Sequence, residues 1–178
     1  MRFLFALAFL LIPASAAAAP KPVDALFSAL AKTSSPEDAK PIEEQIEALF
    51  QQSGSPSVDL LMARAASAVQ GGDADTAKKL LASITSIAPD FAEGWHSRAQ
   101  VQAATGDDEG AMVSLQKTVT LNPRQFTALA ELAGMLADYG DKSAALATYR
   151  KALALDPHMD GVERHVRELS RAVEGDKI

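Results

Sequence analysis

The chain has 178 residues, of which 48% are hydrophobic but only 6% aromatic. Alanine dominates the apolar set, which suits closely packed helices better than sheets, because sheets favour β-branched and aromatic side chains. Seventeen lysines and arginines against 23 aspartates and glutamates give a net charge of −6, so polyanions such as nucleic acids would be repelled. The absence of cysteine excludes disulfides and thiolate metal sites. We expect an all-α protein that does not bind nucleic acid.

Residues 1–19 have the features of a secretory signal peptide: a basic residue at position 2, an apolar stretch of about ten residues and then a run of small residues. The apolar stretch is about half the length that a membrane span requires. Small residues at the expected positions favour cleavage after Ala16 or Ala18. An uncleaved membrane anchor is the alternative. Assuming a bacterial source, the segment predicts a periplasmic protein without stable membrane insertion after cleavage.

Residues 20–56 contain two amphipathic segments, over positions 23–32 and 36–52. Their apolar residues are Leu26, Phe27 and Leu30 in the first and Ile42, Ile46, Leu49 and Phe50 in the second. We expect a degenerate N-terminal helical hairpin that caps the helices following it, with Ser-Gly-Ser-Pro at 53–56 as the connector. A flexible, separate arm is the alternative.

An internal repeat occupies residues 57–157. Pro89, Pro123 and Pro157 lie 34 residues apart, and Gly-Asp pairs at 72–73, 106–107 and 140–141 share that spacing. Glycine accepts the left-handed conformation that ends one helix, and the aspartate side chain accepts backbone N–H groups at the start of the next. Each pair is therefore the turn of a helical hairpin, and each proline closes a repeat. The pattern predicts three repeats, 58–91, 92–125 and 126–157.

Large and small apolar residues alternate by one helical turn within each repeat. Leu61, Trp95 and Leu129 recur in the first helices, and each is followed four positions later by an alanine. The expected helices are 57–70, 73–86, 91–104, 107–120, 125–138 and 141–154.

These residues resemble the tetratricopeptide repeat (TPR) family, most closely in the third repeat. The matching positions there are Leu129, Leu132, Ala133, Leu136, Ala145, Tyr149, Ala152 and Pro157. The resemblance implies a helical solenoid in which the first helix of each repeat lines a concave face, the family's usual peptide site. In the first two repeats Arg64 and Arg98 replace a leucine of the family pattern, and Ala68 and Gln102 replace a large residue. We expect these repeats to bury less apolar area than the third.

The family's groove positions, carried over residue by residue, define the predicted binding site. They are Asp59, Met62, Ala66 and Val69, then Glu93, His96, Gln100 and Ala103, and finally Thr127, Ala130, Gly134 and Ala137. Many are small and leave room for a ligand segment, while Met62 offers an apolar contact and His96 and Gln100 offer polar ones. The alternative is that they only pack a narrow concavity.

The charge of this face predicts the kind of segment it would hold. The basic set that clamps a C-terminal carboxylate in chaperone-binding members is absent, since Met62, Ala66, Glu93 and Ser97 occupy the equivalent places. Asp59, Glu93 and Glu131 make the face slightly acidic, so a neutral, apolar or mildly basic segment is expected.

Arg64 and Arg98 lie 34 residues apart and are expected to stack as a short basic ladder. One interpretation is that both snorkel past the hairpin core to pair with acidic neighbours. The other is that they bind carboxylates of a partner.

Residues 158–178 are expected to supply a capping helix, about 159–173, and a tail. Val162, Val166, Leu169 and Val173 lie on one face of this helix, as a cap for the last repeat requires.

Catalytic and metal-binding patterns are sparse. His158 and His165 lack a metal-ligand spacing, the glycines lie at turns rather than in a phosphate loop, and no Gly-x-Ser-x-Gly elbow is present. We expect no metal, no cofactor and no enzymatic activity.

The predicted function is that of a periplasmic adaptor or scaffold that binds a peptide or protein segment in the concave groove, in a cell-envelope process. Self-association into a structural envelope protein is one alternative, because imperfectly capped repeat ends can stack on one another. A helper role in cytochrome c maturation is another, and it is implied by the family resemblance alone.

Overall fold

The structure, a computed structural model, describes residues 22–175, and regular secondary structure in this range is entirely helical. The helices are α1 (Pro22–Leu30), α2 (Pro36–Phe50), α3 (Pro56–Gln70), α4 (Ala74–Ile87), α5 (Ala92–Ala104), α6 (Asp108–Leu121), α7 (Phe126–Asp138), α8 (Lys142–Leu155) and α9 (Val162–Glu174). The all-α prediction is confirmed. The proposed signal peptide at 1–19 lies outside the described residues.

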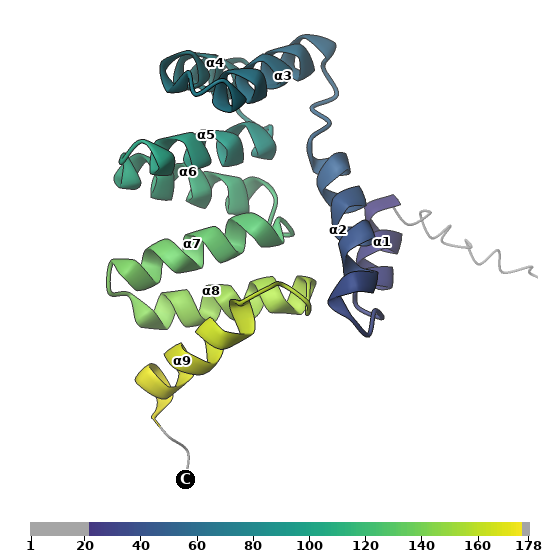
Figure 1. The fold of residues 1–178 in the computed structure, drawn as a ribbon, viewed down its shortest axis with the longest axis vertical. Coiled ribbons are helices and arrows are strands. Elements are labelled where there is room, and N and C mark those ends of the chain that lie inside the picture. The colour runs from purple at the N-terminus through teal and green to yellow at the C-terminus, as the bar shows by residue number, and fades with distance from the viewer. Residues whose placement is uncertain (1–21, 176–178) are drawn as a thin grey trace, which may run out of the picture.

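Three helical hairpins form the body of the molecule, α3–α4, α5–α6 and α7–α8, and they stack in chain order (Figure 1). Every described helix begins and ends within three residues of the position expected from the sequence. The agreement follows from local chemistry, because the residues that start and end each helix act on their own backbone.

The turns inside the hairpins have the predicted chemistry. Their glycines adopt left-handed φ values of +73°, +79° and +89°, at Gly72, Gly106 and Gly140. The aspartate after each glycine accepts a hydrogen bond from a backbone N–H three residues further on, over 3.0–3.1 Å. A side chain other than glycine would be strained at these φ values, so the 34-residue spacing is a backbone constraint.

The repeats differ in how they close their interiors. The first helices α3 and α5 each bury two of the larger or smaller aliphatic side chains, whereas α7 buries five apolar ones, from Phe126 to Ala133. In the middle repeat Gln102 is buried, accepts a hydrogen bond from the Ser114 hydroxyl over 2.6 Å and donates one to Asp107 over 2.8 Å. A polar link thus takes the place of the apolar contact that the third repeat makes.

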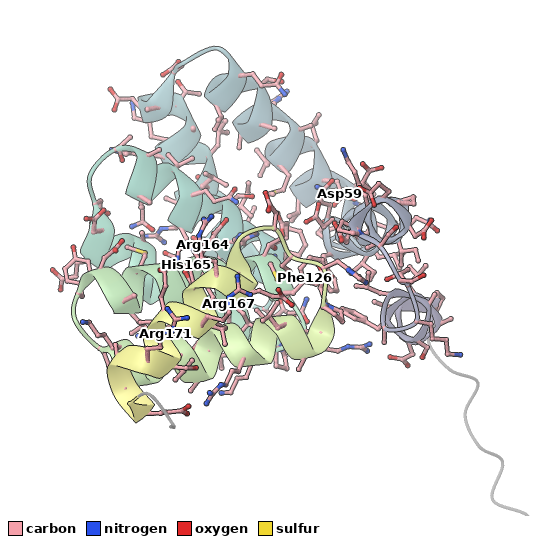
Figure 2. The ribbon with its side chains drawn as sticks, turned by 60° about the horizontal axis from the view of Figure 1, so that its bottom comes forward. Asp59, Phe126, Arg164, His165, Arg167 and Arg171 are labelled. Atoms are coloured by element: carbon pink, nitrogen blue, oxygen red, sulfur yellow. The ribbon has the colours of Figure 1, made fainter. Side chains whose placement is uncertain are left out.

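The N-terminal hairpin does not cap the first repeat, and that expectation was wrong. Phe27, Leu30 and Ile46 are instead buried together with Phe126 at the start of α7. The rings of Phe27 and Phe126 meet edge to face with centroids 6.3 Å apart (Figure 2). The physical reason is that the larger apolar surface lies at the third repeat, where Leu155 and Met159 also pack against this cluster.

As a result α2 runs across the ends of the repeat helices, and not along the top of the stack (Figure 1). The connector to α3 is held by Asp59, whose Oδ1 accepts hydrogen bonds from the Ser53 hydroxyl over 2.5 Å and from the Ser53 backbone N–H over 3.1 Å. Asp59 therefore supports the connector.

The last helix, α9, covers the third repeat. Val162 is buried, and Val166 and Leu169 pack with it against Tyr149 of α8. Val173 was expected on the same face but is 39% exposed, because it lies beyond the end of this contact.

The docking of the N-terminal hairpin leads to a first prediction. Phe126→Ala is expected to cost about 3 kcal/mol of unfolding free energy and to free α1 and α2 from the stack, since the substitution removes the ring that contacts Phe27. Hydrogen exchange measured by mass spectrometry should then rise over residues 22–50. The matched control is Leu115→Ala, a buried truncation in the middle repeat. Equal exchange of residues 22–50 in both variants would contradict the docking.

Candidate functional site

A cavity of about 440 Å³ opens between α3 and α5. Its lining is mostly apolar and consists of Met62, Ala65, Ala66, Val69 and Gln70 from α3, Leu81 from α4, and Ser97, Gln100, Val101 and Ala104 from α5. Three predicted groove residues of the first repeat and Gln100 of the second thus come together. Alanines at 65, 66 and 104 leave the space, because a small side chain on each helix keeps the gap between them unfilled.

The rim of this cavity keeps apolar surface in contact with water. Val69 is 52% exposed and Leu60, on the same helix, is 55% exposed. A mostly apolar recess with a few polar groups at its edge is the usual form of a site for an apolar side chain. We refer to it as the α3–α5 cavity.

A second cavity, of about 220 Å³, lies between the repeats and the N-terminal hairpin. It is lined by Glu47, Phe50 and Gln51 of α2, by Glu93, His96 and Gln100 of α5, and by Gln125, Thr127 and Glu131 at α7. Gln100 lines both cavities, so the two adjoin. We refer to this one as the α2 cavity.

His96 is 5% exposed and lies between two carboxylates in the wall of the α2 cavity. Its Nε2 is 3.0 Å from Glu131 Oε2 on α7, and its Nδ1 is 3.4 Å from Glu93 Oε2 on its own helix. Two amides complete the cluster. Gln100 donates to Glu131 Oε1 over 3.0 Å, and Gln125 donates to Glu93 Oε2 over 2.6 Å. These contacts join the second repeat to the third.

The charges of this cluster favour a protonated imidazole. Burial by itself would lower the pKa of His96, but the hydrogen bonds and charges of Glu131 and Glu93 outweigh it and raise the pKa from 6.5 to about 10. Burial likewise opposes ionisation of Glu131, yet the contacts with His96 and Gln100 lower the pKa of its carboxyl. Imidazolium and carboxylates thus stabilise one another.

The remaining predicted groove residues divide between the cavity and the packed interior. Thr127 lines the α2 cavity. Ala130 packs with the cluster around Tyr149, and a side chain at Gly134 would approach the Tyr149 hydroxyl within 3.3 Å. Ala103 and Ala137 line neither cavity. The candidate site therefore covers the first two repeats and the start of α7, while the rest of α7 follows the packing alternative.

The predicted basic ladder is divided in the same way. Arg98 donates to the Thr85 hydroxyl over 3.1 Å, and its guanidinium lies 5.4 Å from the centre of the Trp95 ring. Arg64 is exposed. Arg98 therefore snorkels as one interpretation expected, but its contacts are a hydroxyl and an indole, not an acidic side chain.

Sequence reasoning missed the wall that α2 provides. Glu47 and Phe50 belong to a segment expected to cap the first repeat, and their contact with α5 is set only by the docking of α1 at the third repeat. Gln125 was also missed, because it precedes α7 and no groove position includes it.

The described part of the chain shows no other chemical centre. No group of three or more His, Asp or Glu between residues 22 and 175 is placed to hold a metal ion. No helix in that range has the length and apolar character needed to cross a membrane. His158 Nε2 lies 3.0 Å from the Thr33 carbonyl oxygen, and the His165 ring stacks on Tyr149, so both side chains have structural contacts.

Comparison with known proteins supports the repeat pattern. The family model described as a tetratricopeptide repeat matches residues 127–159. A TPR repeat-containing protein of Rhizobium etli is 27% identical over 164 residues, which are 92% of this chain and 80% of that protein.

Solved structures share the fold. The first TPR of Spaghetti (RPAP3), bound to the HSP90 peptide SRMEEVD, has a TM-score of 0.60 and 17% identity, over 66% of this chain and 93% of that one. The MamA protein has a TM-score of 0.60 and 14% identity, over 86% of this chain and 83% of that one.

The His96 cluster leads to a second prediction. Because the pKa of His96 is about 10 in the folded protein and 6.5 without these contacts, its stabilising contribution is full below about pH 6.5 and is lost as the pH rises toward 10. Urea unfolding from pH 6 to 10 should show this loss in the wild type and not in His96→Gln. His165→Gln, an exposed control, should keep it. Parallel pH profiles for wild type and His96→Gln would refute the assignment.

Proposed function

Because this chain is a tetratricopeptide repeat protein, we propose that it is a non-catalytic adaptor that binds a segment of another protein in the groove between α3 and α5. The observation that carries the proposal is the α3–α5 cavity, where four predicted groove residues meet around an apolar recess open to water. Apolar surface transferred from water into such a recess contributes about 25 cal/mol per Å². An apolar side chain of the partner would occupy it.

The extent of the site favours a transient contact. Two adjoining cavities of about 440 and 220 Å³ accommodate a few side chains of a segment, far less than the interface of a permanent complex. We therefore expect affinity in the micromolar range, about −8 kcal/mol.

The partner segment differs from the acidic one in the peptide-bound TPR structure. The peptide there ends in Glu-Glu-Val-Asp. Here Glu93 and Glu131 place carboxylates on the same face, and the arginine nearest to it, Arg98, is held by Thr85 and Trp95. Carboxylates of a partner would be repelled, so a neutral or basic segment fits better.

We further propose that the protein acts in the periplasm, in a cell-envelope process. The support is the pattern of residues 1–19, a basic start, a short apolar stretch and small residues before the expected cleavage positions.

The groove assignment leads to a third prediction, based on two alanines of α3. Ala66 lines the cavity and Ala63, three residues earlier, does not, although both are exposed. Ala66→Arg should reduce partner capture from a periplasmic extract about tenfold, because the long side chain fills the recess, whereas Ala63→Arg should capture as the wild type does. Circular dichroism would verify that both variants fold. Equal capture by the two variants would place the binding surface elsewhere.

The location leads to a fourth prediction. Expressed with its first 19 residues, the protein should be released by osmotic shock and should begin at residue 17 or 19 on N-terminal sequencing. A variant with Leu11→Arg in the apolar stretch should stay unprocessed in the cytoplasm. An intact N-terminus in the wild type would rule out a cleaved signal.

A further inference from the structure

We propose that the bound segment carries an arginine next to its apolar residue, and that the α2 cavity receives the guanidinium while the α3–α5 cavity receives the apolar side chain. The inference rests on the proposed function and specifies the chemistry of the segment.

The two cavities adjoin at Gln100, which supplies part of the lining of each. In an extended peptide, side chains two residues apart point to the same side and lie about 7 Å from one another. A single segment can therefore place one side chain in each cavity, in the order apolar–x–Arg or Arg–x–apolar.

The hydrogen-bonding groups of the α2 cavity call for a ligand that donates. The donors of His96, Gln100 and Gln125 are already directed to Glu93 and Glu131. Glu47, the third carboxylate of the cavity, has no hydrogen bond or ion pair among the described residues. Arginine carries five N–H donors and no acceptor, so it matches this unmet demand.

A buried amide in the same wall gives a second, independent observation. Gln125 is 2% exposed, and its Oε1 is the buried side-chain oxygen that lacks a hydrogen-bond partner within residues 22–175. Buried acceptors are nearly always paired in folded proteins, so an unpaired one in the wall of a cavity indicates that a donor is missing.

The net charge of the cavity has the same sense. Glu47, Glu93 and Glu131 supply three carboxylates, and the His96 imidazolium compensates only one of them. Burial raises the pKa of the Glu47 carboxyl, and the charge of Glu93 raises it further. A cation beside Glu47 would relieve both effects.

Phe50 favours arginine over a smaller cation. Its ring lines the α2 cavity together with the carboxylates. The chain uses the same combination elsewhere, because the Arg124 guanidinium lies 3.9 Å from the centre of the Phe27 ring while it pairs with Asp24. A planar guanidinium can stack on a ring and bond a carboxylate at once, which a lysine ammonium does less well.

The fifth prediction tests this chemistry with synthetic peptides. The purified ¹⁵N-labelled protein is titrated with acetyl-Gly-Ser-Leu-Ser-Arg-Ser-Gly-amide, with its reversed-order form, and with forms that carry glutamine or lysine for arginine, or serine for leucine. We expect the better-oriented arginine peptide to bind about tenfold more tightly than its glutamine form and to shift amides of α2, α3 and α5. The Glu47→Gln variant should lose most of this difference. Glu44→Gln, exposed on the same helix and outside both cavities, should keep it.

The outcomes separate this inference from the proposed function. If leucine peptides bind at α3 and α5 but arginine and glutamine forms bind equally, the arginine subsite is refuted and the groove stands. If no leucine peptide shifts α3 and α5 amides at millimolar concentration, both are refuted. If arginine amide alone binds as well as the whole peptide, the cavity holds a free small cation and the proposed segment is wrong.

Discussion

The apolar contact between α1 and the start of α7 is the one on which the candidate site depends. Phe27 and Phe126 meet there, and Leu30 and Ile46 are buried in the same cluster. Because the N-terminal hairpin is attached at the third repeat while α2 must return to α3 at the first, α2 has to cross the intervening repeat. That crossing places Glu47 and Phe50 opposite α5 and creates a cavity that the repeats alone do not form.

The His96 cluster has a different role from this apolar contact. A buried ion pair contributes little net stability, because the desolvation of its charges offsets their attraction, but removal of one partner is costly. The cluster therefore acts mainly on geometry. It sets how α5 lies against α7 through the contact with Glu131, and it keeps a polar surface at the level where neighbouring repeats would otherwise close with apolar side chains. This opening is what adjoins the α3–α5 cavity at Gln100.

Recognition would then be divided between two parts of the fold. The repeats supply an apolar recess, whose depth comes from alanines on α3 and α5. The hairpin supplies charge and an aromatic ring through Glu47 and Phe50. A surface of small residues on stacked hairpins is common to many repeat proteins, so selectivity in this chain would come from the element that does not belong to the repeats.

The sequence by itself determined the repeats, because a glycine at positive φ, an aspartate cap and a proline act on their own backbone within a few residues. It also determined that Met62, Ala66 and Val69 share one face, through helical periodicity and the family pattern. Only the tertiary structure decided where the N-terminal hairpin docks and hence that Glu47 faces His96. The reason is that an amphipathic helix specifies which of its faces is buried but not which apolar surface buries it, and here the partners Phe27 and Phe126 lie far apart in the chain.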